Sequence, residues 1–217
     1  MIADELLKKA HYFYSLAKGE DLPANSDNLK TIIKNIEELD TYTARKEYAE
    51  KNLTHLSSGS SRIVYLVDDD IVIKLAKNDK GIAQNKAECN PKMKSKFLNE
   101  AIDHAKDYSW MQTHKLKKIT AKEFREMTDI DFDDFGEAIR YGLKKVSGNT
   151  EKDKPKNFDK VSKSEIYKEM VRIGKQFKLM PGDLARISSW GTRNGNPVLI
   201  DAGLTQDVFE KYYKSSS

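Results

Sequence analysis

Cysteine is almost missing from this chain of 217 residues, since Cys89 is the single one. One cysteine can form neither an intramolecular disulfide nor a cysteine-cluster metal site, which indicates a reducing compartment or indifference to redox. We expect Cys89 to be a buried structural thiol. Long apolar runs are missing too: none approaches the roughly 20 residues that a membrane span requires. The first five residues lack the charge and apolar order of a signal peptide. These absences predict a cytoplasmic protein.

A dominant charge of one sign is also lacking. The 38 Lys and Arg residues against 34 Asp and Glu give a net charge of +4, which predicts a surface of mixed sign. Such a balance does not predict nucleic-acid binding. Only the lysine-rich stretches of the chain leave that function open. With 38% hydrophobic and 33% charged residues, the chain is typical of a globular protein that buries a core. Its length fits one domain or two small lobes that share a cleft.

Helical spacing of apolar residues, or a capping box, predicts much of the regular structure. We expect helices over residues 2–18, 26–39, 81–88, 97–108, 120–127, 135–143 and 165–177. Two of these helices follow capping boxes, Thr120–Glu123 and Ser162–Glu165. The helix over residues 135–143 follows an acidic cap at residues 131–134, and residues 108–111 are a candidate strand. Residues 144–164 are rich in Lys, Asn, Asp, Ser and Gly, which is typical of a flexible solvated loop.

A β-hairpin is predicted between residues 63 and 76. Ile63–Val67 and Ile71–Ala76 are rich in β-branched residues and flank a short acidic turn. The preceding loop, Ser57–Arg62, consists mainly of small residues that can bring backbone N–H groups close to a phosphate. Lys74 lies inside the second apolar run. An isolated lysine there more often belongs to an edge strand and points to water.

Two aspartates near the C-terminus flank a second predicted hairpin. Asn194-Gly195 is a turn signal between two short runs. Asp183 precedes this hairpin, and Asp201 ends its apolar run and enters Ala-Gly. Taken singly, each aspartate could be a turn or helix-cap residue. Their order around a hairpin is the order in which a kinase places its catalytic base and its magnesium ligand.

The sequence of these features along the chain resembles the protein-kinase-like fold, including its aminoglycoside-phosphotransferase relatives. It is most similar to short kinase-like proteins encoded by bacteriophages, which would place it in the host cytoplasm. The resemblance covers residues 45–205 and rests on three segments: Leu56–Tyr65, Lys74–Asn78 with Gln84-Asn85, and Gly182-Asp183-Leu184 through Gly203.

The resemblance implies ATP and Mg²⁺ as cofactors and assigns roles to individual residues. The loop that covers the nucleotide phosphates would be made by Gly59, Ser60 and Ser61. Lys74 would contact the α- and β-phosphates. Glu88, on the following helix, would pair with Lys74 and hold it in position. Glu100 is the alternative partner, because Glu88 is nearer to the lysine in sequence than is usual.

Asp183 would be the catalytic base that orients an attacking hydroxyl and accepts its proton, and Asp201 would bind Mg²⁺. The asparagine that holds a second magnesium in the family is missing, and Ser188 or Ser189 stands in its region as a candidate metal ligand.

Only residues 204–217 follow the Asp-Ala-Gly segment. This predicts a truncated C-lobe without the usual peptide-binding platform.

We therefore expect an α+β, minimal two-lobed kinase-like fold. Its parts would be N-terminal helices over residues 1–52, an N-lobe with a small antiparallel sheet over 53–118, and a mainly helical C-lobe over 119–217. The predicted function is ATP- and Mg-dependent transfer of a phosphoryl group to a hydroxyl of a protein or small molecule. The alternative is a pseudokinase, a nucleotide-binding or protein-interaction module without turnover. The missing asparagine and the single glycine of the loop favour that alternative.

Overall fold

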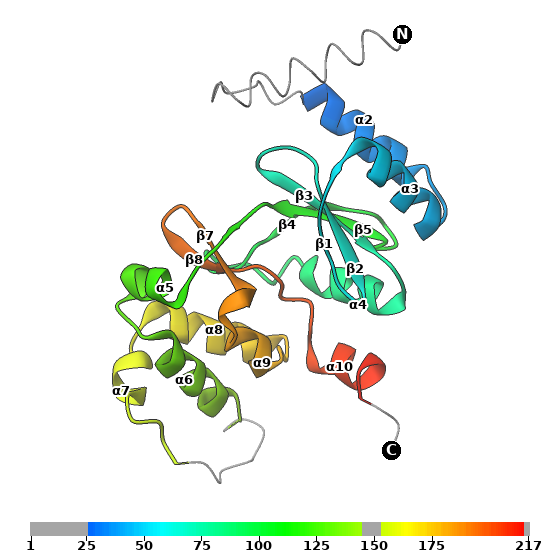
Figure 1. Cartoon of the computed structure of the whole chain (residues 1–217). Helices are drawn as coiled ribbons and strands as arrows, with labels where there is room; N and C mark the ends of the chain where they lie inside the picture. Colours follow the sequence, from blue (N-terminus) through cyan, green and yellow to red (C-terminus); the bar gives the residue numbers. More distant parts are fainter. Residues whose placement is uncertain (1–25, 145–152, 215–217) are drawn as a thin grey trace, which may run out of the picture. The chain divides into compact units, whose positions relative to one another are not determined.

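The computed structural model describes residues 26–144 and 153–214 (Figure 1). The helix expected over residues 2–18 and part of the loop expected over 144–164 lie outside these ranges. The chain divides into two compact units, residues 1–38 and 39–217. In the first unit, α2 (Ser26–Glu37) confirms the helix expected over residues 26–39.

The second unit begins with helix α3 and a five-stranded antiparallel sheet of order β1-β2-β3-β5-β4 (Figure 1). The elements are α3 (Tyr42–Asn52), β1 (Thr54–Ser58), β2 (Arg62–Leu66), β3 (Ile71–Ala76), α4 (Asp79–Glu88), β4 (Ala101–His104) and β5 (Trp110–His114). The hairpin predicted between residues 63 and 76 is confirmed as β2 and β3. Helix α3 contacts β1 and β3, and α4 contacts β3 and β5.

Lys74 lies at the centre of this sheet and not at its edge. Its strand, β3, pairs with β2 on one side, where Val64 faces Lys74, and with β5 on the other, where Met111 does. The residue is only 3% exposed. This excludes the alternative that Lys74 is an edge-strand lysine that points to water. Strand order depends on long-range pairing, which the local pattern does not contain.

The helix expected over residues 97–108 is also wrong. Residues 101–104 form β4, which pairs with β5 at the edge of the sheet. Tyr108 has a φ of 60°, a left-handed conformation that no helix continues through. Pairing with a neighbouring strand has overridden a short helical pattern, as tertiary context does for weak local preferences.

The remainder of the chain is mainly helical, with a small sheet of order β6-β7-β8. Its elements are β6 (Lys117–Lys118), α5 (Ala121–Thr128), α6 (Phe132–Lys144), α7 (Phe158–Val161), α8 (Glu165–Gln176), α9 (Pro181–Leu184), a 3-10 helix (Ile187–Ser189), β7 (Trp190–Arg193), β8 (Asn196–Leu199) and α10 (Gln206–Tyr212). The small antiparallel sheet followed by helices confirms the expected α+β fold class. Within the described residues, no helix has the length and apolar character needed to cross a membrane.

Local capping signals placed the starts of α5, α6 and α8 to within three residues. The capping box at the start of α5 is complete, since the Thr120 hydroxyl accepts from the Glu123 N–H and the Glu123 carboxylate accepts from the Thr120 N–H. For α8 the cap is Ser164 and not Ser162, because the helix starts at Glu165. Helix α6 starts three residues earlier than expected, where Asp131 Oδ1 accepts a hydrogen bond from the N–H of Asp133.

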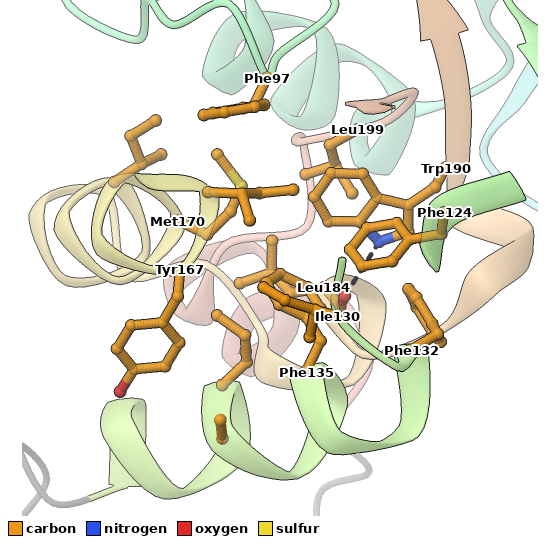
Figure 2. Close-up of a cluster of buried hydrophobic side chains, with 14 of the residues drawn as sticks. Phe97, Phe124, Ile130, Phe132, Phe135, Tyr167, Met170, Leu184, Trp190 and Leu199 are labelled. Carbon is orange, nitrogen blue, oxygen red and sulfur yellow. Dashed lines mark hydrogen bonds between the residues drawn. The ribbon is translucent and has the colours of Figure 1, made fainter. Parts of the chain in front are cut away.

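An aromatic cluster forms the core of the helical part (Figure 2). The centre of the Phe124 ring lies 5.0 Å from the ring centre of Phe132, 5.1 Å from that of Phe135 and 5.7 Å from that of Trp190. The Trp190 indole N–H donates to the carbonyl of Leu184 at 3.0 Å, the dashed line in Figure 2. This buried bond fixes β7 against α9 and so places Asp183, the neighbour of Leu184.

The hairpin of β7 and β8 places the second aspartate. Asn194 and Gly195 have φ angles of 51° and 73°, which suit the tight turn that Asn-Gly predicts. The carbonyl of Leu199, at the end of β8, accepts from the N–H of Asn99 at 3.0 Å and so ties the hairpin to the segment that precedes β4. Asp201 follows β8 after a single residue. The predicted Asp-hairpin-Asp arrangement is thus held by strand pairing and by the aromatic core.

Candidate active site

A pocket of about 390 Å³ lies between the β1–β2 loop and the two aspartates. Its lining residues are Ser57, Ser58, Gly59, Ser60, Ser61, Arg62, Val64, Lys74, Gln84, Asp183, Asp201 and Leu204. The volume falls in the range of small-molecule sites, roughly 300–1,000 Å³. The fold therefore brings the predicted loop, lysine and aspartates together from two regions that are far apart in the sequence, residues 57–84 and 183–204.

Lys74 is joined to two carboxylates. Its Nζ donates to Glu88 Oε2 at 2.8 Å and also to Asp201 Oδ1. Glu88 is the last residue of α4, and its side chain is only 2% exposed. Glu100, the alternative partner, instead accepts a hydrogen bond from the N–H of Ser95 at 3.2 Å. In the structure, Glu88 is the partner of the strand lysine.

Arg62 belongs to the same charged group, although the sequence interpretation gave it no role. Its Nη1 lies 2.6 Å from Glu88 Oε1, and its Nη2 lies 3.4 Å from Asp201 Oδ1. A signal was available: Val64 pairs with Lys74, so Arg62, two residues earlier in β2, must lie on the same face of the sheet as Lys74. Two cations and two carboxylates thus form one cluster at the pocket.

The cluster keeps Asp201 and Arg62 ionised. The partial burial of Asp201 would by itself raise the pKa of its carboxyl, but the positive charges of Lys74 and Arg62 outweigh it and hold this pKa well below its usual value. Burial would lower the pKa of Arg62, but Glu88 and Asp201 outweigh it and raise this pKa. Asp201 is consequently a carboxylate at any pH near neutrality, which is the state in which it can bind a cation.

Asp183 lies in a different environment. It sits in the short helix α9, and its side chain is 28% exposed. Burial raises its pKa, the nearby charge of Asp201 raises it further, and Arg186 at 3.7 Å acts in the opposite direction; the net effect is a raised pKa. The two aspartates of one pocket therefore have pKa values shifted in opposite directions, a pattern typical of carboxylates with different chemical roles.

The loop between β1 and β2 is held by the residues that follow β3. Lys77 Nζ donates to Ser58 Oγ at 2.6 Å and to the Gly59 carbonyl at 2.7 Å. Asn78 Nδ2 donates to the carbonyl of Ser60 at 3.1 Å. The Ser61 hydroxyl donates to Gln84 Oε1 at 2.8 Å, so this side chain is tied to α4. The loop is a fixed wall of the pocket.

Helix α4 approaches this wall closely. A Cβ added to Gly81 would lie 2.2 Å from the carbonyl oxygen of Ser61, so a larger residue cannot replace this glycine without moving the loop or the helix. The same helix carries Gln84 and Glu88. Its position therefore sets both the loop and the partner of Lys74.

Ser188 and Ser189 lie in the 3-10 helix after α9 and are not among the residues that line the pocket. In the described part of the chain, no group of three or more His, Cys, Asp or Glu side chains is arranged to hold a metal ion. A magnesium ion commonly takes one or two carboxylates and completes its coordination with substrate phosphates and water. Asp201 fits that mode, because its side chain is 55% exposed.

Cys89 follows Glu88 directly. We expected a buried thiol, but the structure shows that it is only partly buried. Burial and the neighbouring carboxylate of Glu88 raise the pKa of its thiol to about 12. A thiol with so high a pKa carries almost no thiolate near neutral pH and is a poor nucleophile. It contributes no chemistry to the pocket.

Several solved structures resemble this chain, and two of them are aminoglycoside phosphotransferases. The APH(2")-IIa of a ternary complex with streptomycin and ATP is 16% identical, with 76% of this chain and 71% of that chain covered and a TM-score of 0.36. Aminoglycoside phosphotransferase APH(2'')-Ib with ADP bound is 17% identical, with the same coverage and TM-score. No protein-family model matches the chain, and no curated protein matches it. These values are too low to transfer an activity or a substrate to this chain.

Proposed function

We propose that this chain is a phosphotransferase that uses ATP and Mg²⁺ to transfer a phosphoryl group to a hydroxyl of a small molecule or protein. The observation that carries the proposal is the contact of buried Lys74 with Glu88 and Asp201 at a pocket that Asp183 also lines. Phosphoryl transfer depends mainly on positioning and on neutralising charge. These residues supply the groups that such a reaction requires.

The pocket suits a nucleotide phosphate chain. Lys74 and Arg62 are 3% and 11% exposed in their side chains, so their charges are poorly screened by water. The small residues of the β1–β2 loop allow a phosphate to approach the backbone. Asp201, half exposed and ionised, would hold Mg²⁺ together with phosphate oxygens. When bound, ATP supplies the phosphoryl group and Mg²⁺ neutralises its developing charge.

Asp183 would act as the base. Its raised pKa makes it a better proton acceptor than an ordinary exposed aspartate. It would orient the acceptor hydroxyl and take its proton as the oxygen attacks. Lys74 would neutralise the phosphates, and Glu88 would hold Lys74 in place from α4.

The test compares ATP turnover in the wild type with that of Asp183→Asn and Lys74→Met. Asp183→Asn should lower turnover by about 100-fold or more, since general base catalysis is commonly worth 10²–10⁴. It should still show ATP-dependent thermal stabilisation, because binding shifts the unfolding equilibrium without any reaction. The matched control is Asp207→Asn, an exposed aspartate of α10 that pairs with Lys178, and its turnover should be unchanged.

Absence of ATP turnover in the wild type, or turnover that survives in Asp183→Asn, would contradict the proposal.

A pseudokinase is the second candidate, and one observation favours it: the serines that stand in the place of the family's asparagine do not line the pocket. A pseudokinase would be stabilised by ATP and would release no ADP. The same two measurements therefore distinguish the candidates.

A further inference from the structure

Arg62 adds positive charge to the pocket, but the reaction proposed above assigns it no contact with the nucleotide. It opens β2 directly after the loop that walls the pocket, and its side chain is 11% exposed. A guanidinium stays protonated at any physiological pH, so Arg62 brings a permanent positive charge into the pocket. A buried charge is costly unless it is paired. The partners of Arg62 therefore indicate which of its donors could bind a ligand.

The partners of Arg62 divide into fixed and movable groups. Its Nη1 donates to Glu88 at 2.6 Å and to Asn85 Oδ1 at 3.2 Å, and both partners are buried on α4. Asn85 is itself anchored, because its Nδ2 donates to the carbonyl of Tyr108 at 2.9 Å. Nη2 instead faces Asp201, whose side chain is 55% exposed. One edge of the guanidinium is fixed, and the other is held by the carboxylate that a metal ion would engage.

The number of carboxylates around Lys74 and Arg62 also indicates that one cation can bind a ligand. Lys74 and Arg62 together share one buried carboxylate, Glu88. Asp201 supplies the second negative charge by contacting both cations. If Asp201 turns to a metal ion, one positive charge of the pair is left without a protein partner. That charge lies beside the loop where a phosphate chain would be bound.

We propose that Arg62 is a second phosphate-binding cation that acts with Lys74 on the phosphate chain of the nucleotide. Asp201 occupies the phosphate-facing edge of the guanidinium in the free protein. A planar guanidinium with one edge anchored offers directed donors to a phosphate, a geometry that an ammonium group cannot reproduce. This inference rests on the proposed function, because it assumes that the pocket takes a nucleotide.

The experiment measures binding without turnover. Calorimetry is carried out on the wild type, Arg62→Gln and Arg62→Lys with Mg-ATP, with inorganic tripolyphosphate and with adenosine. Arg62→Gln should bind Mg-ATP and tripolyphosphate about 10- to 100-fold more weakly, the range for losing a charged hydrogen bond. Arg62→Lys should be intermediate, and adenosine affinity should be unchanged in both. The matched control, Arg193→Gln on the exposed end of β7, should bind all three ligands as the wild type does.

Three outcomes would overturn the inference. The first is unchanged tripolyphosphate affinity in a folded Arg62→Gln. The second is an equal loss of adenosine and tripolyphosphate affinity, which would mark Arg62 as structural. The third outcome applies if Arg62→Gln does not fold and cannot be measured. In that case, the inference is overturned if Arg62→Lys, which keeps the charge beside Glu88, binds tripolyphosphate as tightly as the wild type. A wild type that binds none of the ligands would instead contradict the proposed function itself.

Discussion

Replacing Glu88 with glutamine removes a negative charge that serves two buried cations at once. Lys74 donates to one carboxylate oxygen at 2.8 Å, and Arg62 lies 2.6 Å from the other. In the variant, both cations depend on Asp201, whose side chain is 55% exposed and therefore screened by water. Replacing Lys74 with methionine is different, since Glu88 then keeps Arg62 as its partner. The two halves of one ion pair should therefore have unequal effects on stability.

The expected magnitudes follow from burial. Removing one partner of a buried ion pair costs about 3–5 kcal/mol, because the other charge is left uncompensated. Glutamine keeps an acceptor oxygen, so Glu88→Gln should cost about 3 kcal/mol in the free energy of unfolding. Lys74→Met should cost about 1–2 kcal/mol, since an apolar chain of similar length fills the space and no charge is stranded. The double variant should cost less than the sum of the two.

The assay is urea unfolding at neutral pH, read as the change in unfolding free energy at equal m values. Glu169→Gln is the control: this glutamate, whose side chain is 27% exposed, forms an ion pair at 2.7 Å with the exposed Arg172 of the same helix, and its loss should cost less than about 1 kcal/mol. If Lys74→Met destabilises the protein as much as Glu88→Gln or more, Glu88 does not serve both cations. The shared-carboxylate description of the cluster would then be wrong.

Three further predictions address other parts of the site. Arg186→Gln should move the acid limb of the turnover-against-pH profile to higher pH, because Arg186 lowers the pKa of Asp183; a shift to lower pH would contradict this. Gly203→Ala should destabilise by about 1–3 kcal/mol in thermal unfolding, since an added Cβ would lie 2.7 Å from a carboxylate oxygen of α4. Gly182→Ala, where a Cβ meets no atom within 4 Å, should stay within about 0.5 kcal/mol. Tyr213→Phe should cost about 1 kcal/mol in urea unfolding, because its hydroxyl accepts a hydrogen bond from α4 at 3.0 Å; no change would show that this bond is not made.

Short-range signals in the sequence determined the elements that carry the site. The hairpin of β2 and β3 follows from β-branched runs around an acidic turn, and the turn at Asn194-Gly195 requires the positive φ angles that these residues tolerate best. The capping box before α5 works through contacts three residues apart. Because each signal acts within a few residues, it can be interpreted without knowing the rest of the fold.

The tertiary structure alone decided how the charged residues are paired. Strand order placed Lys74 in the centre of the sheet, and the position of α4 brought Glu88 to it in preference to Glu100. The same packing added Arg62, and it left the serines after α9 out of the pocket. The energy of these contacts depends on burial and on distances between segments up to 127 residues apart, as between Lys74 and Asp201. No local pattern encodes such distances, so residue types and their order indicated the chemistry. The packing of α4 on the sheet, and the hydrogen bonds between β8 and residues 97–99, decided which residues share it.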